Sequence, residues 1–161
     1  MYNLHAVRMP EYGSIIPSAI GNEVKMARLW VERKEDGTWV GHKDDKAEIV
    51  FGHGDGLFTP GDLLKIALAG CGGLSSQFAV ESALGKNKGA RVIVDGTYDP
   101  DSDAYINFSE QLVVDAADAH LSDGDAQKLK ERIRRHVDKS CTVMHTLNEA
   151  PSTRLDITIR R

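Results

Sequence analysis

Apolar residues recur at three- and four-residue steps in one long stretch of the chain and alternate with polar residues in several shorter stretches. The first spacing predicts helices, and the second predicts half-buried strands. Helices are predicted over residues 59–84 and from Ser122 onward, with a short helical turn from Ser140 to Leu147. Strands are predicted over residues 24–34, 38–40, 47–51, 90–98, 105–115 and 154–160.

Turn residues join these strands into hairpins. The sequence EDG at 35–37 separates the first two strands, and DPDSD at 99–103 separates the fourth from the fifth. Strands, a buried helix, strands, a surface helix and a last strand, in that order, predict an α+β fold with antiparallel sheets. Proline and glycine interrupt residues 1–22, which are predicted to form an irregular N-terminal arm, followed by a single domain over residues 23–161.

The long helix has a clear start and an unusual composition. Thr59 is placed to cap it, and Pro60 is tolerated in its first turn because the missing N–H would have been unpaired there. Its surface is apolar nearly all round, which predicts a buried helix. The second helix is amphipathic, with an apolar stripe on one side and charged residues facing water.

Composition excludes several classes of partner. The chain has 161 residues, 41% of them hydrophobic, and a formal net charge of −4 with both signs mixed along its length. This pattern indicates neither a nucleic-acid surface nor an anionic membrane surface. The longest apolar run near the start, residues 15–20, is too short for a signal peptide or a membrane span, so we expect a cytoplasmic protein.

Cys71 is set among glycines in the middle of the long helix. Gly70, Gly72 and Gly73 each cost about 1 kcal/mol of helix stability relative to alanine. Such glycines let another backbone, a partner helix or a ligand approach closely. Two interpretations follow: a thiol that something must reach, or close helix packing around an inert cysteine.

Cys141 is placed at or just inside the start of a short helix. Backbone N–H groups and the helix dipole favour a thiolate at such a place, and His136 and Lys139 add nearby positive charge. Cys141 also continues the apolar four-residue steps of the preceding helix, from Val137. A reactive thiol and an ordinary core cysteine are therefore both open.

Three segments carry a resemblance to a known family. They are TPGDLL at 59–64, ALAGC at 67–71, and CTV at 141–143. Together with the order of elements over residues 24–161, they resemble the OsmC/Ohr family, the osmotically inducible and organic hydroperoxide resistance proteins. The resemblance implies an intertwined homodimer in which Cys71 is the peroxidatic cysteine and Cys141 the resolving cysteine of the same chain.

The same resemblance implies a reaction. A Cys71 thiolate reduces a hydroperoxide to an alcohol, the resulting sulfenic acid forms a disulfide with Cys141, and an external dithiol, in the family often a lipoylated protein, regenerates the thiols. No cofactor and no metal are expected. The apolar residues around Cys71 favour an organic hydroperoxide over hydrogen peroxide; these are Leu64, Leu68, Leu74 and Phe78.

The chain departs from the family pattern in two places. Many members carry a glutamate after the helix-starting proline, where it holds an arginine against the reactive thiol, but this chain has Gly61, and Asp62 would point about 100° away. The arginine is predicted to be Arg33 in the first hairpin, with Arg28 as second choice. The family's common proline after the second cysteine is Thr142 here.

Two other functions stay open. One is a non-peroxidatic OsmC-like protein that binds a small apolar ligand, which the absence of the glutamate favours. The other is a cysteine hydrolase or zinc site that uses Cys141 and His145, which share a helix face. A zinc site needs three or four ligands, and no CxxC or HExxH motif accompanies this pair.

Overall fold

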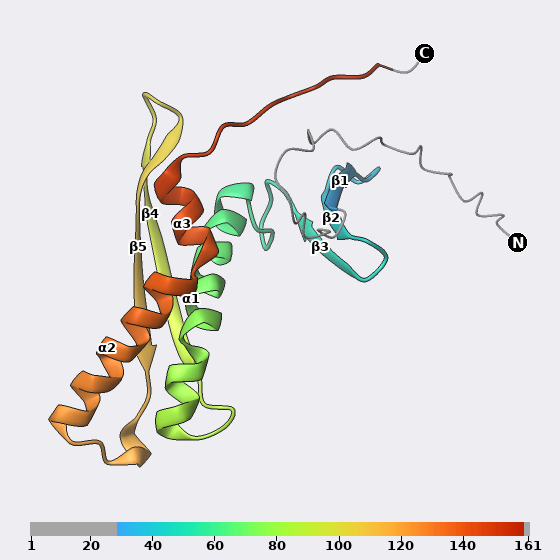
Figure 1. The fold of residues 1–161 in the computed structure, drawn as a ribbon. Helices are drawn as coiled ribbons and strands as arrows, with labels where there is room; N and C mark the ends of the chain where they lie inside the picture. The colour runs from blue at the N-terminus through green and yellow to red at the C-terminus, as the bar shows by residue number, and fades with distance from the viewer. Residues whose placement is uncertain (1–28, 160–161) are drawn as a thin grey trace, which may run out of the picture.

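The structure is a computed structural model that describes residues 29–159. A long two-stranded antiparallel hairpin supports three helices, and a separate three-stranded sheet lies beyond the N-terminal end of the longest helix (Figure 1). The order of elements is β1 Leu29–Arg33, β2 Trp39–Lys43, β3 Ala47–Phe51, α1 Pro60–Leu84, β4 Ala90–Asp99, β5 Ala104–Val114, a 3₁₀ turn Ala117–Ala119, α2 Asp123–Ser140 and α3 Thr142–Glu149. This arrangement confirms the predicted α+β fold.

The start of α1 is fixed by reciprocal capping. The Thr59 hydroxyl accepts from the Asp62 backbone N–H at 3.2 Å, and the Asp62 carboxylate accepts from the Thr59 backbone N–H at 3.0 Å. Pro60 occupies the first helical position, where its missing N–H is not needed. At the other end Gly85 has a φ of 100°, in the left-handed region that glycine adopts without strain, and it ends the helix.

One face of α1 is buried, which corrects the expectation of a helix buried all round. The buried side packs against β4 and α2 through residues that include Leu68, Ala79 and Val80. Leu74, on the opposite side, is 74% exposed, and Phe78, at the border of the buried side, is 68% exposed. By length and composition alone α1 could cross a membrane, a test that core helices of soluble proteins also pass. The apolar surface predicted from the sequence is present, but the elements of residues 29–159 leave part of it uncovered.

A β-bulge places a tyrosine over the start of α1. In the β4–β5 hairpin Thr97 pairs with Asn107 and Tyr98 pairs with Tyr105, so Ile106 is an extra residue on β5. The bulge turns Tyr105 toward α1, where a Cβ on Gly61 would lie 2.6 Å from its hydroxyl oxygen. Gly61 is therefore required by the ring that lies against it.

The predicted last strand, Arg154 to Arg160, is wrong for the single chain. Residues 151–159 have no regular structure and extend away from α3 (Figure 1). The alternating side chains of Leu155, Ile157 and Ile159 are 82%, 77% and 81% exposed. Alternation predicts a strand only where a sheet edge is available to pair with it, and no described strand pairs with this segment.

Part of the N-terminal prediction cannot be compared with the structure. The irregular arm predicted over residues 1–22 lies outside the described residues, as do the first residues, 24–28, of the first predicted strand. The domain boundary between residues 22 and 23 therefore stays a prediction.

Replacing Thr59 by alanine should destabilise the fold, because the first turn of α1 loses the hydroxyl that accepts from the Asp62 amide. We expect the free energy of unfolding to fall by about 1 kcal/mol. Thr59→Ser keeps a capping hydroxyl and is the matched control. Chemical denaturation measures both changes, and equal stability of the alanine and serine variants would contradict the capping role.

Candidate active site

The two cysteines meet where α3 begins. Cys71 lies in the middle of α1, and Cys141 lies between the end of α2 and the start of α3. Because α2 packs along α1 and the chain turns at Cys141 into α3, the first residues of α3 reach the Cys71 turn of α1. The two thiols lie close enough for each to shift the pKa of the other. The structure therefore brings together the two residues that the sequence singled out.

The surroundings of Cys71 favour its thiolate. Burial acts to raise its pKa, but hydrogen bonds from the Val143 amide, the Cys141 thiol, the Thr142 amide and the Ser75 hydroxyl outweigh burial. The pKa of Cys71 therefore lies below its usual range. Amides at the start of a helix are suited to this task, because they have no partner within the helix and lie at its positive end.

The surroundings of Cys141 have the opposite effect. Its side chain is fully buried, and burial raises the pKa of its thiol. The Met144 amide acts to lower the pKa, whereas the charges of Cys71 and Glu110 raise it further. Of the two interpretations of Cys141, the raised pKa and the burial of its thiol favour the core cysteine over a thiolate at the helix start. The amides of Thr142 and Val143 point at Cys71, and the helix start activates the neighbouring cysteine instead.

Among the three helix glycines beside Cys71, Gly72 is the one that a side chain approaches closely. A Cβ on Gly72 would lie 2.9 Å from Oε1 of Glu110, a separation at which one of the two must shift. A Cβ on Gly73 would make an ordinary 3.6 Å contact with Val92, and one on Gly70 would meet nothing within 4 Å in this chain. The close approach predicted from these glycines is thus made by a carboxylate of β5.

Sequence reasoning missed Glu110. Phe108, Glu110 and Leu112 are two residues apart on β5 and lie on the face that turns toward the helices. A carboxylate between two apolar residues on this face was the signal in the sequence that could have identified Glu110. Desolvation raises the pKa of the Glu110 carboxyl. In the part of the chain that the structure describes, this carboxylate has no salt-bridge partner.

Tyr105 and Asp62 explain the departure from the family pattern at Gly61. The Tyr105 hydroxyl fills the space next to Gly61, so a larger side chain could not be held there without displacing the ring. Asp62 is committed to capping Thr59 and to a 3.1 Å ion pair with Lys65, which together lower its pKa to about 2. Asp62 is therefore a structural carboxylate and does not take the place of the missing glutamate.

Arg33 is not beside the thiols in this chain. It lies at the end of β1 with an exposed side chain, and a Cβ on Gly37 of the following turn would lie 3.5 Å from its Nη2. Among the described residues, no arginine is a main influence on the pKa of Cys71. Arg28, the second choice, lies outside the described residues. The role of Arg33 stays a prediction that depends on a second subunit.

The other candidate residues are engaged elsewhere. The ring of His136 packs against Phe78, with ring centroids 5.7 Å apart, and Nε2 of His145 lies 2.8 Å from the backbone oxygen of Asp138. Within residues 29–159, neither they nor Lys139 are among the main influences on the pKa of either thiol. Among residues 29–159 no group of three or more His, Cys, Asp or Glu side chains is placed to hold a metal ion. The arrangement gives no support to the zinc or hydrolase interpretation.

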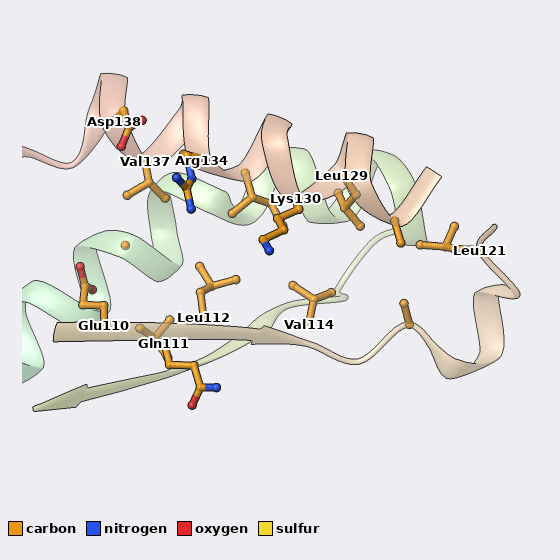
Figure 2. Close-up of a pocket in the computed structure, with 15 residues that line it drawn as sticks. Glu110, Gln111, Leu112, Val114, Leu121, Leu129, Lys130, Arg134, Val137 and Asp138 are labelled. Atoms are coloured by element: carbon orange, nitrogen blue, oxygen red, sulfur yellow. The ribbon is translucent and has the colours of Figure 1, made fainter. Parts of the chain in front are cut away.

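Two hollows meet at Glu110. A groove of about 550 Å³ lies between α2 and β5, with apolar walls that include Leu112, Val114 and Leu129 (Figure 2). Lys130 and Arg134 reach into it from α2, and Glu110 rises from β5 toward the helices (Figure 2). A second pocket of about 430 Å³ lies on the other side, against Leu68 of α1 and Met144 of α3, and Glu110 lines it too.

The fold and the paired thiols define a small α+β protein with a dithiol site where the start of α3 meets the central helix, α1. Residues 52–156 match the model of the OsmC family, described as OsmC-like protein, and the chain belongs to this family. Uncharacterized proteins of Mycobacterium tuberculosis and Mycobacterium bovis are 35% identical over 134 residues, which cover 82% of this chain and 96% of theirs.

Solved structures show the same fold. The crystal structure of an OsmC-like protein from Mycoplasma pneumoniae matches with a TM-score of 0.57 at 18% identity, over 78% of this chain and 89% of that one. A structural-genomics structure matches with a TM-score of 0.51 at 22% identity, over 76% and 90% of the two chains.

The opposed pKa shifts predict selective labelling. Because the pKa of Cys71 is lowered and that of Cys141 is raised, the Cys71 thiolate should form first as the pH rises. Iodoacetamide at about pH 7, below the usual thiol pKa of about 8.5, should therefore alkylate Cys71 and spare Cys141 in the folded protein. Peptide mass spectrometry reads the labelled site. Denatured protein, in which both thiols react, is the control, and equal labelling in the folded state would contradict the assignment.

Proposed function

We propose that this OsmC-like protein is a thiol-dependent peroxidase that reduces organic hydroperoxides. The observation that carries the proposal is the contact between a thiol with a lowered pKa and a buried thiol with a raised pKa. A peroxidatic cysteine must be a thiolate to attack, and its resolving partner must be within reach to close a disulfide. The pair meets both requirements.

The proposed reaction has three steps. The Cys71 thiolate attacks the terminal peroxide oxygen, the O–O bond breaks, and the alkoxide takes a proton and leaves as an alcohol. The Cys141 sulfur then attacks the Cys71 sulfenic acid, a disulfide forms and water leaves. A dithiol, such as a lipoylated protein, reduces the disulfide by exchange. The reaction needs no bound cofactor or metal.

The position of Cys71 on α1 supports an apolar substrate. Cys71 lies at the border between the buried side of the helix and its exposed apolar side, roughly 60° from Leu68 in one direction and roughly 60° from Leu74 in the other. Phe78 lies two turns further along the same border, exposed. An organic hydroperoxide that approaches the thiol would contact carbon on both sides, whereas hydrogen peroxide gains nothing from such contacts.

The same exposed side supports a homodimer. Leu74 and Phe78 form an apolar surface beside Cys71. Within residues 29–159, none of the helices packs against the sheet of β1, β2 and β3 (Figure 1). A second copy that placed this sheet over α1 would cover both surfaces at once. It would also carry Arg33 toward a Cys71, which is how the arginine of the family pattern could reach the thiol.

A non-catalytic ligand-binding role is the second candidate. Tyr105 fills the position of the glutamate that many family members use, and the groove between α2 and β5 could hold an apolar ligand. The two roles differ in one observable. A binding protein would bind without consuming peroxide, whereas a peroxidase turns over with a dithiol.

Serine variants separate the roles of the two thiols. With cumene hydroperoxide and a dithiol, Cys71→Ser should show only background consumption, because a hydroxyl is a far weaker nucleophile near neutral pH. Cys141→Ser should consume about one equivalent of peroxide per subunit and then stop or slow, since its sulfenic acid has no resolving partner. Loss of the first equivalent in Cys141→Ser alone would reverse the assignment, and full activity in both variants would refute it.

A charge on the exposed side of α1 should prevent dimer formation. Leu74→Glu places a carboxylate where we propose subunit contact, so it should sediment as a monomer at micromolar concentration while the wild type sediments as a dimer. Arg135→Glu, on the exposed side of α2, is the control and should leave the dimer intact. A monomeric wild type would contradict the proposal, and so would partition of the wild type into lipid vesicles, which would make the surface a membrane contact.

A further inference from the structure

We propose that Glu110 takes the proton of Cys141 when the disulfide with Cys71 forms. The inference rests on the proposed peroxidase function and adds a residue that the reaction needs but the cysteine pair lacks. The inference is based on the position of the Glu110 carboxylate. It lies against Gly72, the residue after Cys71, and it lines both the groove and the second pocket.

The resolving step needs a proton acceptor. Cys141 is fully buried, and its thiol is kept protonated by burial and by the negative charge of the Cys71 thiolate. Oxidation of Cys71 to a sulfenic acid removes that charge, but burial remains. A thiol is a poor nucleophile until its proton leaves, and a fully buried sulfur cannot give its proton directly to bulk water.

Glu110 lies in the region of the two thiols, with its Oε1 2.9 Å from where a Cβ on Gly72, the residue after Cys71, would be. Its charge is one of the influences that raise the Cys141 pKa, so the two groups interact electrostatically. Proton transfer from Cys141 to Glu110 moves one negative charge within the site and creates no additional charge. Partial desolvation of the carboxyl makes it a stronger base than an ordinary glutamate.

No neighbouring charged residue among residues 29–159 pairs with the Glu110 carboxylate, so it is free to accept a proton. Lys130, Arg134 and Asp138 of α2 line the same groove, but none forms an ion pair with Glu110 in residues 29–159. On β5 itself Tyr105 lines the second pocket, and its hydroxyl lies against Gly61. The neighbours of Glu110 on α3 in that pocket, which include Met144 and Leu147, carry no charge.

The proposed step balances without a further reactant. Cys141 gives its proton to Glu110, and its sulfur forms a bond with the sulfur of Cys71. The S–O bond of the sulfenic acid breaks, and the leaving hydroxide takes the proton from Glu110 and departs as water. Glu110 is again a carboxylate at the end, and the two cysteines have been oxidised to a disulfide at the expense of the sulfenic acid.

Glu110 can lie in this position because Gly72 has no side chain. An alanine Cβ would lie 2.9 Å from its Oε1 and would push the carboxylate aside. The displaced group is the end of a flexible side chain, so the helix itself should still fold. Gly72→Ala therefore tests the placement of the carboxylate without removing it, and Gly73→Ala, whose Cβ makes an ordinary 3.6 Å contact, is its matched control.

The experiment follows the two oxidation steps separately in the full-length reduced protein. Cumene hydroperoxide is mixed rapidly with the protein, and samples are quenched with acid and read by intact mass. One readout is the rate at which peroxide is consumed in the first turnover. The other is the rate at which the Cys71–Cys141 disulfide forms, measured from about pH 6 to about pH 9, across the usual thiol pKa.

Glu110→Gln should leave the first rate within about twofold of wild type and slow disulfide formation at neutral pH by roughly a hundredfold, the usual scale of a general base. The deficit should shrink as the pH rises, because hydroxide then removes the proton. Glu110→Asp should recover part of the rate. Asp138→Asn removes a carboxylate of the same groove that is not among the main influences on either thiol, and it should resemble wild type.

Gly72→Ala should show the same pH-dependent defect more weakly, and the double variant Gly72→Ala with Glu110→Gln should be no slower than Glu110→Gln alone. Wild-type disulfide formation in Glu110→Gln at every pH would overturn the inference, and so would a defect that is independent of pH or is reproduced by Gly73→Ala. Absence of the first peroxide equivalent in the wild type would instead refute the peroxidase function itself.

Discussion

The start of α3 against the middle of α1 is the contact on which the site depends. It presents the amides of Thr142 and Val143 to the Cys71 sulfur and, one residue earlier, brings the buried Cys141 thiol alongside. The amides of this helix terminus lower the pKa of the Cys71 thiol, whereas burial raises that of the Cys141 thiol beside it. The long helix supplies the thiol and the short helix supplies its charge stabilisation, so neither element forms the site alone.

Glycine at three positions shows how the sequence accommodates this contact. Gly61 makes room for the Tyr105 ring, Gly96 lies under the same ring, and Gly72 makes room for Glu110. The side chains that lie against these glycines, Tyr105 and Glu110, both come from β5. The bulge at Ile106 determines which side chains of β5 face the helices. The hairpin of β4 and β5 is therefore both the support of α1 and the source of the polar groups around its cysteine.

Local patterns predicted most of the fold and singled out the two cysteines that the structure brings together. Capping by Thr59 and Ser122, the helix spacing and the strand alternation gave element bounds that the structure confirms closely. The last strand failed because alternation in residues 154–159 does not say which edge will pair with it. A place at a helix start did not identify which cysteine becomes the thiolate, because the direction in which the helix amides point depends on the junction of α2 with α3. Glu110 was missed because its contact with Gly72 joins residues far apart in the chain.

The most direct test of this account removes one amide. Thr142 stands where the family commonly has proline, and proline is well tolerated at the first position of a helix but has no N–H to donate. Thr142→Pro should keep α3 intact, by circular dichroism, and raise the pKa of Cys71, measured from thiolate absorbance as the pH increases. An upward shift of the first thiol titration is the result that the account predicts. An unchanged titration in a folded variant would contradict the claim that the start of α3 activates Cys71.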